Sequence, residues 1–372
     1  MAPVERLKGA PVDIGAEVKE LENARLLSPK ERRLDRAAQF AILAARAALQ
    51  DADWRGDGDS AGAVVGSSRG PCGLLEYFHG SFLENPRRIS PAASPRTTPG
   101  NLAGSVSIHC GLRGPSMVVS AACASGSQAI GLAFQMIRAG MADMMVAGGT
   151  EAALTPFTIA MLAAAGILSP SAPAPRPFDR ERNGTVIGEG AGMLVLESER
   201  HWRARRGRGR RPYCELAGFG ASSDALSLAA VAPDGEGLAR AIASALEGAR
   251  LAPRKIGYVN AHGTGTPAGD AAETRALKAA LGRHAFGAAV SSTKSMTGHL
   301  LGAAGGIEAI VCALALARGV VPPTINLDCP GDGCDLDYTP GKARRRALRA
   351  ALSVSMGFGG ANACLAFAAW RP

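Results

Sequence analysis

The residue in this sequence best placed to act as a nucleophile is Cys123. It lies between an apolar run, Ser116–Ser120, and a stretch of small residues that leads into a helical pattern. This order predicts a buried strand, a sharp turn and a helix, which is the arrangement of a nucleophile elbow. The free N–H groups at a helix start favour a thiolate. Taken alone, however, a single cysteine is more often an inert buried thiol.

Two of the six histidines stand at predicted junctions between elements. His262 follows the apolar run Ile256–Asn260 in NAHGTGTPAGD, and His299 opens the helical pattern in GHLLGAAG. Active sites of α/β proteins gather at such junctions. A histidine at a helix N-terminus tends to stay neutral, and two neutral donors on one thioester oxygen would stabilise an enolate. The alternative for each is a structural histidine.

Lys294 and Glu308 flank His299 in the sequence. Lys294 precedes it by five residues, and Glu308 follows it by nine within the apolar stretch GAAGGIEAIVCALALA. A carboxylate in apolar surroundings needs a partner, and Lys294 is the candidate. The alternatives are a surface lysine and a glutamate at a packing seam.

A glycine-rich turn, Met356–Ala363, joins two predicted strands near the C-terminus. Gly357 and Gly359 surround Phe358, which indicates backbone of positive φ. The N–H groups could line an oxyanion site with Phe358 at its entrance. An ordinary hairpin turn is the alternative, and a phosphate loop is disfavoured because no Walker lysine or GxGxxG register is present.

Thr264 and Thr266 flank Gly265 directly after His262. Hydroxyl groups beside a catalytic histidine would suit a polar, amide-containing substrate arm. The alternative is simple turn chemistry.

Strands alternate with helices in both halves of the chain. Many of the strands are short apolar runs, as expected for an α/β sheet covered on both faces. A hinge is predicted near Arg200–Arg211 and a long loop at Gly80–Gly100. The predicted helices are Leu34–Ala52, Cys123–Ala139, Gly235–Ala249, Asp270–Leu281 and His299–Arg318. The predicted strands are Ala61–Gly66, Ser116–Ser120, Met144–Ala147, Met193–Glu197, Cys214–Gly218, Ile256–Asn260, Ala288–Ser292, Ala351–Met356 and Cys364–Ala369.

Length and charge narrow the class of protein. A chain of 372 residues suggests two domains or one duplicated domain. The formal net charge of +9 suggests an acidic partner. The two basic runs, Arg203–Arg211 and Lys342–Arg349, contain no interleaved aromatic residues, so a nucleic-acid surface that stacks bases is disfavoured.

Cysteine usage and hydropathy indicate the compartment. None of the eight cysteines forms a CxxC pair, which leaves a zinc site unsupported. Most lie in apolar runs, as free buried thiols do in a reducing cytoplasm. The N-terminal segment lacks the apolar core of a signal peptide, and no uncharged apolar run predicts a membrane span.

Together these motifs resemble a known family. The segments VSAACASG, RPFDRERNGTVIGEGAG, VNAHGTGTPAGD, SSTKSMTGHLLGAAG and SMGFGGANA occur in the order found in elongating β-ketoacyl-acyl carrier protein synthases of types I and II. Related polyketide ketosynthase domains, in the same thiolase superfamily, share them. The resemblance runs from about Gly15 to Trp370. Ala121 departs from it, since threonine is common there.

The resemblance implies an α/β fold of the thiolase type. Two βαβαβαββ halves would stack as a five-layer α-β-α-β-α sandwich, normally in a homodimer. Residues 1–205 would form the half with the nucleophilic cysteine, and residues 206–372 the half with the histidines and lysine. The family begins with a strand of the type VVVTGxG that has no match here, so the first half is expected to lack an edge or central strand.

Roles for single residues follow from the same resemblance. Cys123 corresponds to the acylated nucleophile. His262 and His299 correspond to the histidines of decarboxylation and condensation, and Lys294 and Glu308 to the supporting lysine and glutamate.

The remaining matched residues belong to the entrance and the substrate arm. Phe358, between Gly357 and Gly359, corresponds to the gating phenylalanine, whose N–H joins that of the nucleophile in an oxyanion hole. Thr264 and Thr266 correspond to the threonines that hold phosphopantetheine.

The implied reaction is a decarboxylative Claisen condensation by a ping-pong route. The cysteine takes an acyl group from acyl carrier protein, malonyl-carrier protein loses CO2, and the enolate attacks the acyl thioester to give a 3-oxoacyl product. No metal or organic cofactor is implied. The expected partners are acyl carrier protein and a second ketosynthase chain, identical or related. Fatty acid and polyketide pathways both remain open.

Three other classes of protein share parts of this pattern. A thiolase would carry a second cysteine in a C-terminal CxGxG, and a type III synthase would carry asparagine in place of His299; neither pattern is present. A non-catalytic partner of the chain-length-factor kind in a heterodimer stays open, although such partners lose the nucleophile that Cys123 supplies here.

Overall fold

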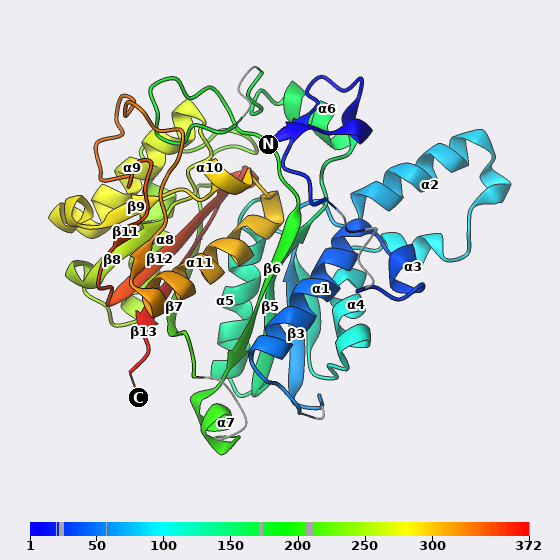
Figure 1. The fold of residues 1–372 in the computed structure, drawn as a ribbon, viewed down its shortest axis with the longest axis horizontal. Coiled ribbons are helices and arrows are strands. Elements are labelled where there is room, and N and C mark those ends of the chain that lie inside the picture. The colour runs from blue at the N-terminus through cyan, green and yellow to red at the C-terminus, as the bar shows by residue number, and fades with distance from the viewer. Residues whose placement is uncertain (20, 22–25, 57, 171–173, 206–210, 372) are drawn as a thin grey trace.

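The computed structural model describes residues 1–19, 21, 26–56, 58–170, 174–205 and 211–371. Two β-sheets lie face to face, with helices between them and on both outer faces (Figure 1). The predicted α/β sandwich of the thiolase type is confirmed.

The first sheet has the strand order β4-β3-β5-β6. Its strands are β3 (Ala61–Gly66), β4 (Ser116–Val119), β5 (Met144–Glu151) and β6 (Gly190–Glu197). β3 pairs in parallel with β4 and β5, and β6 runs antiparallel to β5. β3 and β5 are buried along their whole length, which explains their mostly apolar sequences; the charged exception is Glu151 at the end of β5.

The second sheet has the strand order β7-β13-β12-β8-β9. Its strands are β7 (Cys214–Ser223), β8 (Ile256–Asn260), β9 (Ala289–Ser291), β12 (Ala350–Gly357) and β13 (Ala361–Ala369). β8 pairs in parallel with β9 and β12, whereas β13 runs antiparallel to both β12 and β7.

The two sheets repeat one pattern. The order β4-β3-β5-β6 corresponds to β9-β8-β12-β13, with the last strand antiparallel in each. β7 then adds an edge strand beside β13, but no described strand lies on the corresponding edge of β6. Among the described residues, the four strands of the first sheet therefore match β9, β8, β12 and β13 of the second.

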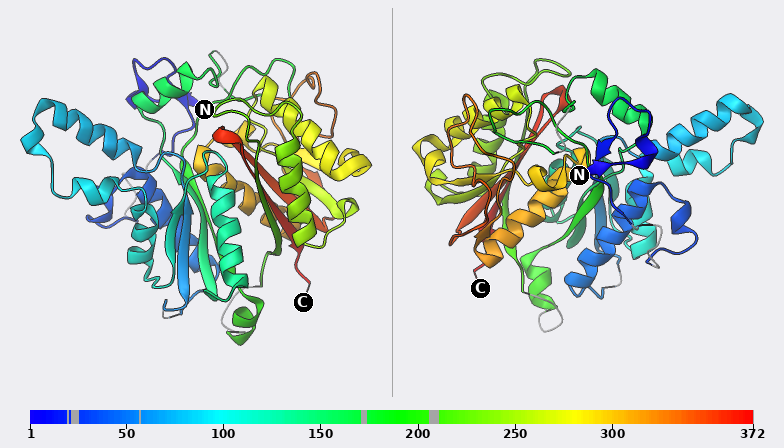
Figure 2. Two further views of the ribbon diagram at one scale, coloured as in Figure 1. Left: turned by 180° about the vertical axis from the view of Figure 1, so that it is seen from behind. Right: turned by 45° about the horizontal axis from the view of Figure 1, so that its top comes forward.

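Six helices complete the layers. α5 (Ser125–Arg138) and α11 (Ala304–Arg318) lie between the sheets, where their small and apolar residues share one core with strands of both (Figures 1 and 2). α1 (Arg36–Asp51) and α4 (Asn101–Cys110) cover the outer face of the first sheet. α8 (Glu236–Gly248) and α9 (Pro267–Leu281) cover that of the second.

The prediction of a long loop at Gly80–Gly100 is wrong. Residues 72–97 form an arm of α2 (Cys72–Glu84), η3 (Pro86–Arg88) and α3 (Ala93–Thr97), which projects from the body of the molecule (Figures 1 and 2). Gly80 lies inside α2 at an exposed position, although glycine disfavours a helix interior by about 1 kcal/mol relative to alanine. α6 (Pro156–Ala164) was also not predicted.

The predicted start of one helix and the predicted hinge also need correction. α11 begins at Ala304 rather than His299, after the short turns α10 (Lys294–Thr297) and η6 (Leu301–Ala303). Positive φ angles at Gly298 and Leu301 prevent one continuous helix. In the predicted hinge, Glu199–Ala204 form helix α7, and residues 206–210 lie outside the described residues, so the division at 205/206 stays a prediction.

Short pairs complete the described elements. β1 (Ala2–Pro3) pairs with β2 (Ile14–Gly15), and β10 (Val320–Val321) with β11 (Arg344–Arg345). One helical stretch of the described chain, Leu301–Arg318, is long and apolar enough to cross a membrane, but 67% of it is buried inside the molecule. It serves as the core helix between the sheets.

Candidate active site

Cys123 lies in a tight turn between β4 and α5. Ala122 has a φ of 47°, and the Ser125 hydroxyl accepts the Ala121 N–H at 2.9 Å and donates to the Ala122 carbonyl at 2.5 Å. A Cβ added at Gly126 would lie 2.8 Å from the Gly302 carbonyl oxygen, which explains the small residues here. Cys123 stands two residues before α5, not within it as predicted.

The structure brings both predicted histidines to this thiol. His299 Nε2 lies 3.1 Å from Cys123 Sγ. The rings of His262 and His299 meet edge to face, with centroids 5.4 Å apart. The backbone of His299 is held by Val186, whose carbonyl accepts its N–H at 2.8 Å, and by Gly188, whose N–H donates to its carbonyl at 3.0 Å.

Both histidines are held in the neutral form. Burial lowers the pKa of each well below its usual range, and the nearby charge of Lys294 acts in the same direction. His299 is therefore neutral because it is buried, not because it stands at a helix N-terminus as predicted. Neither Nδ1 atom has a hydrogen-bond partner among the described residues. A bare acceptor nitrogen is less costly to bury than an N–H, so the proton belongs on Nε2, which for His299 faces Cys123.

Lys294 and Glu308 form the predicted pair. The Lys294 ammonium donates to Glu308 Oε1, and their side chains are only 1% and 2% exposed. Burial raises the pKa of Glu308, and Lys294 opposes that rise. Lys294 thus supplies a positive field next to Cys123 while Glu308 anchors it.

The glycine-rich turn reaches the nucleophile through Gly357. A Cβ added there would lie 2.8 Å from the Ala121 carbonyl oxygen and 3.1 Å from the Cys123 nitrogen. This close approach places the backbone of half-buried Phe358 one residue from the amide of Cys123. Gly359, with φ of 76°, is exposed and donates its N–H to the Leu228 carbonyl at 2.8 Å, so that N–H is not directed to a substrate. The oxyanion and gating roles of Phe358 stay predictions.

Thr264 and Thr266 face each other at the start of α9. Their hydroxyl oxygens are 3.1 Å apart, and Gly265 between them has a φ of 82°. Thr264 is buried and Thr266 is half-buried at the helix cap. The pair lies two residues beyond His262, where a substrate arm would pass, and its binding role stays a prediction.

Two buried carboxylates position the site and were missed in the sequence. Glu273 accepts the backbone N–H groups of His262 and Gly263 at 2.6 and 2.7 Å. Glu151 accepts the N–H groups of Ser68, Arg69 and Gly302 and the Ser67 hydroxyl. The sequence offered two signals of such buried carboxylates. Glu151 ends the otherwise uncharged strand β5, and Glu273 lies on an alanine-rich face of α9.

The resting state of the thiol can be tested by its pH dependence. Burial raises the pKa of Cys123 to about 12, with Lys294 acting against it. Below that pKa the thiolate fraction grows tenfold per pH unit, so alkylation of Cys123 by iodoacetamide should quicken about tenfold per unit between pH 7 and 9. Intact-mass analysis against Cys123→Ala measures the rate at this one residue. A rate that is flat above pH 7 would contradict a protonated resting thiol.

Comparison with protein families matches most of the chain. Residues 9–201 match the N-terminal domain of β-ketoacyl synthases, and residues 213–328 match their C-terminal domain. A 3-oxoacyl-[acyl-carrier-protein] synthase 2 from a Synechocystis strain is 45% identical over 95% of this chain and 86% of its own length. A Vibrio harveyi protein of the same name is 44% identical over 94% of the chain and 86% of its own length.

Solved structures agree with these relatives. A type II polyketide ketosynthase, solved with its acyl-carrier protein and a bound hexaketide, superposes with a TM-score of 0.90 at 33% identity over 100% of this chain and 92% of that one. The ishigamide ketosynthase/chain length factor gives 0.92 at 32% identity over the same shares. With the geometry around Cys123, these matches establish that the chain belongs to the β-ketoacyl synthase family of acyltransferases.

Proposed function

We propose that this protein condenses an acyl group on Cys123 with malonyl-acyl carrier protein to give 3-oxoacyl-acyl carrier protein. The observation that carries the proposal is the 3.1 Å contact between Cys123 Sγ and His299 Nε2, beside the neutral ring of His262. A nucleophile next to two neutral donors suits acyl transfer followed by enolate formation.

The first half-reaction loads the enzyme. The Cys123 sulfur attacks the thioester carbonyl of an acyl-carrier protein, and its proton leaves with the carrier thiol. Lys294 and the Nε2–H of His299 stabilise negative charge on sulfur as it forms, which offsets part of the burial that disfavours the thiolate.

The second half-reaction makes the carbon–carbon bond. Breaking the bond to CO2 leaves an electron pair on the malonyl fragment, and its thioester oxygen becomes an enolate that His262 and His299 hold through Nε2–H. The enolate carbon attacks the acyl-Cys123 carbonyl. The N–H groups of Cys123 and Phe358 donate to the oxyanion, and the cysteine sulfur leaves as a thiolate that takes up a proton from solvent. Thr264 and Thr266 hold the phosphopantetheine arm. No cofactor takes part in these steps.

The acyl substrate of the proposal is a fatty acyl chain. The two 3-oxoacyl-[acyl-carrier-protein] synthases are 44–45% identical to this chain, against 32–33% for the two ketosynthase structures above. A non-catalytic partner is not favoured, because the nucleophile and both histidines are assembled. Acyl carrier protein is the proposed partner, and the free state of all eight cysteines fits a reducing cytoplasm.

Removal of His299 tests the decarboxylation step. His299→Ala should lower CO2 release from malonyl-carrier protein by about 10²–10³-fold, because one of two enolate donors is lost. Product mass from acyl- and malonyl-carrier protein measures the whole reaction in parallel. His284→Ala, a histidine outside the site, serves as the matched control. Unchanged CO2 release in His299→Ala would refute the assigned role, and wild-type protein without condensation product would sink the proposed function.

We further infer a homodimer. The arm of residues 72–97 exposes large apolar side chains, with Leu75, Tyr77, Phe82 and Leu83 between 48% and 69% accessible. Such a cluster is typical of a protein interface. Sedimentation of the purified chain alone should show a particle of twice the 38.0 kDa chain mass, and Leu83→Lys should shift it toward one chain. A monomer at all micromolar concentrations would favour a heterodimer with a related ketosynthase.

A further inference from the structure

Arg69 stands beside the active site, and no step of the proposed mechanism uses it. It lies in the bend between β3 and α2, where its side chain is half-buried. Among the described residues its Nε atom is buried without a hydrogen-bond partner, and its guanidinium forms no ion pair and stacks on no ring. We propose that Arg69 is a specificity-determining residue, which binds a carboxylate on the acyl group that is loaded onto Cys123.

The backbone of Arg69 is fixed next to the catalytic segments. Glu151 accepts the N–H groups of Ser68 and Arg69 at 2.7 and 3.1 Å, and that of Gly302 at 3.0 Å. A Cβ added at Gly302 would lie 2.3 Å from the Ser68 nitrogen. One buried carboxylate thus ties the bend after β3 to the segment that follows His299. Rigid backbone of this kind is what a side chain needs to recognise a substrate group.

The lack of a partner sets Arg69 apart from comparable arginines. Within the described ranges, Arg96 and Arg182 also have a buried Nε without a hydrogen bond. Arg182, however, donates to two backbone carbonyl oxygens at 2.8 and 3.2 Å, and Arg96 lies over the Phe78 ring, 5.8 Å from its centroid. Arg69 has neither kind of contact. A guanidinium that is partly removed from water without an acceptor costs free energy, which an anionic ligand would recover.

Electrostatics place Arg69 near the sulfur and away from the histidines. Burial raises the pKa of Cys123, and the positive charges of Lys294 and Arg69 both lower it. The pKa values of His262 and His299 are lowered by burial and by Lys294, without a contribution from Arg69. In the proposed mechanism the two rings hold the malonyl thioester. The carboxylate that Arg69 binds therefore belongs to the acyl group and not to malonyl.

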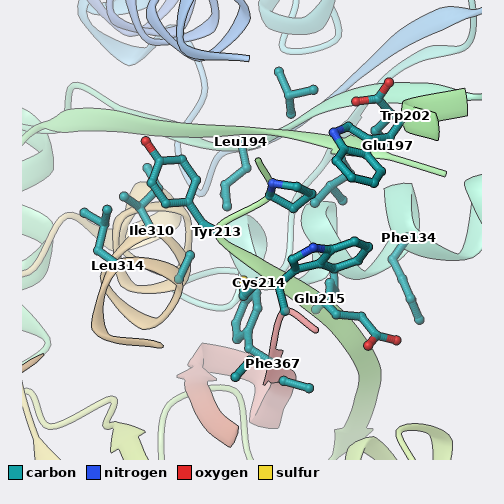
Figure 3. Close-up of a pocket in the computed structure, with 18 of the residues that line it drawn as sticks. Phe134, Leu194, Glu197, Trp202, Tyr213, Cys214, Glu215, Ile310, Leu314 and Phe367 are labelled. Atoms are coloured by element: carbon teal, nitrogen blue, oxygen red, sulfur yellow. The ribbon is translucent and has the colours of Figure 1, made fainter. Parts of the chain in front are cut away.

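The cysteine also borders an apolar surface that suits a short chain. Cys123 packs against a buried cluster to which Ile159 and Leu162 of α6 belong. The cavity shown in Figure 3 is a different place, because it is lined by parts of β6, α11 and β13 and by neither Cys123 nor Arg69. The methylene groups of an acyl chain would contact the α6 cluster while its carboxylate reaches the guanidinium.

The chemistry of the guanidinium defines the class of acyl group. Its parallel N–H donors match the two oxygens of a carboxylate, and the pairing is charge-assisted. Because the charge of Arg69 lies near the sulfur, the carboxylate should stand only a few carbons from the thioester. The inference rests on the acyl transfer proposed above. It adds that the fatty acyl chain starts from the half-thioester of a short dicarboxylic acid.

The loading half-reaction tests this preference. Glutaryl- and pentanoyl-carrier protein, which have equal carbon chains and differ in the terminal carboxylate, are each incubated with the full protein, and the acyl adduct on Cys123 is followed by intact mass. We expect the wild type to load glutaryl about 10–100-fold faster. Arg69→Leu should reverse this order, because a neutral side chain suits the alkyl end. Arg69→Lys keeps the charge and should retain part of the preference.

Arg113→Leu is the matched control, because this arginine is exposed and pairs with Asp59; it should load both groups as the wild type does. Equal loading of the two groups by the wild type, or an unchanged preference in Arg69→Leu, would overturn the inference and leave the acyl transfer intact. Loading of neither group would overturn both.

Two further readouts of Arg69→Leu would also overturn the inference. A loss of CO2 release from malonyl-carrier protein that matches the loss of glutaryl loading would assign Arg69 to the malonyl carboxylate. Sedimentation as a single chain would assign it to a carboxylate of a second copy. The comparison of glutaryl with pentanoyl on the wild type remains decisive if Arg69→Leu does not fold.

Discussion

Cys123→Ala is expected to abolish acyl loading and to lower condensation by about 10³-fold or more, because the covalent intermediate has no other nucleophile in reach. Other cysteines are not placed to take the acyl group. Cys312 and Cys364 are fully buried in the core, and Cys329 lies exposed on the surface. Intact-mass analysis after incubation with acyl-carrier protein should show one acyl adduct on the wild type and none on the variant.

The same variant separates loading from decarboxylation. His262 and His299 remain in place, so CO2 release from malonyl-carrier protein should persist when Cys123 is replaced. Cys329→Ala is the matched control and should load and condense as the wild type does, because this thiol lies outside the site. An acyl adduct on Cys123→Ala would place the nucleophile elsewhere and remove the basis of the proposed mechanism.

Lys294→Met is expected to destabilise the fold by about 3–5 kcal/mol, because it leaves Glu308 buried without its partner. Condensation should fall as well, since the positive field beside the cysteine is lost. Burial already raises the pKa of Glu308, and loss of Lys294 raises it further. A carboxyl with a raised folded-state pKa is stabilised in its protonated form, so the variant should gain stability relative to the wild type as the pH falls and lose it as the pH rises. Urea unfolding at several pH values measures this difference.

A double variant distinguishes the two roles of the ion pair. Lys294→Met with Glu308→Leu removes both charges and should recover most of the lost stability, because an apolar pair of similar volume replaces a buried ion pair at little cost. Condensation should not recover, since the lysine charge near Cys123 stays absent. Activity restored together with stability would show that the pair serves folding alone.

Sequence patterns located most of the secondary structure. The strands Ala61–Gly66 and Ile256–Asn260 agree with the structure residue for residue, because short apolar runs flanked by turn residues have few other interpretations. The helix predicted at Leu34–Ala52 is close to α1. Residues 80–97 of the arm were mistaken for part of a loop, since its helices are mostly exposed and lack the apolar stripe that burial imposes.

The chemistry of the site was also predicted from residue types and order. Cys123, His262, His299 and the pair Lys294–Glu308 were identified before any contact was known, and the structure places them together. Glu151 and Glu273 were missed, because each acts by accepting backbone N–H groups, which no side-chain motif records.

The sequence by itself therefore determined which side chains can react, because residue type and local spacing carry that chemistry. Tertiary structure alone decided the protonation of the histidines and the arrangement of strands in the two sheets. The histidines are neutral because distant segments bury them, not because His299 starts a helix. The correspondence between β4-β3-β5-β6 and β9-β8-β12-β13 emerged only when the two sheets were compared, since pairing joins segments that are far apart in the chain.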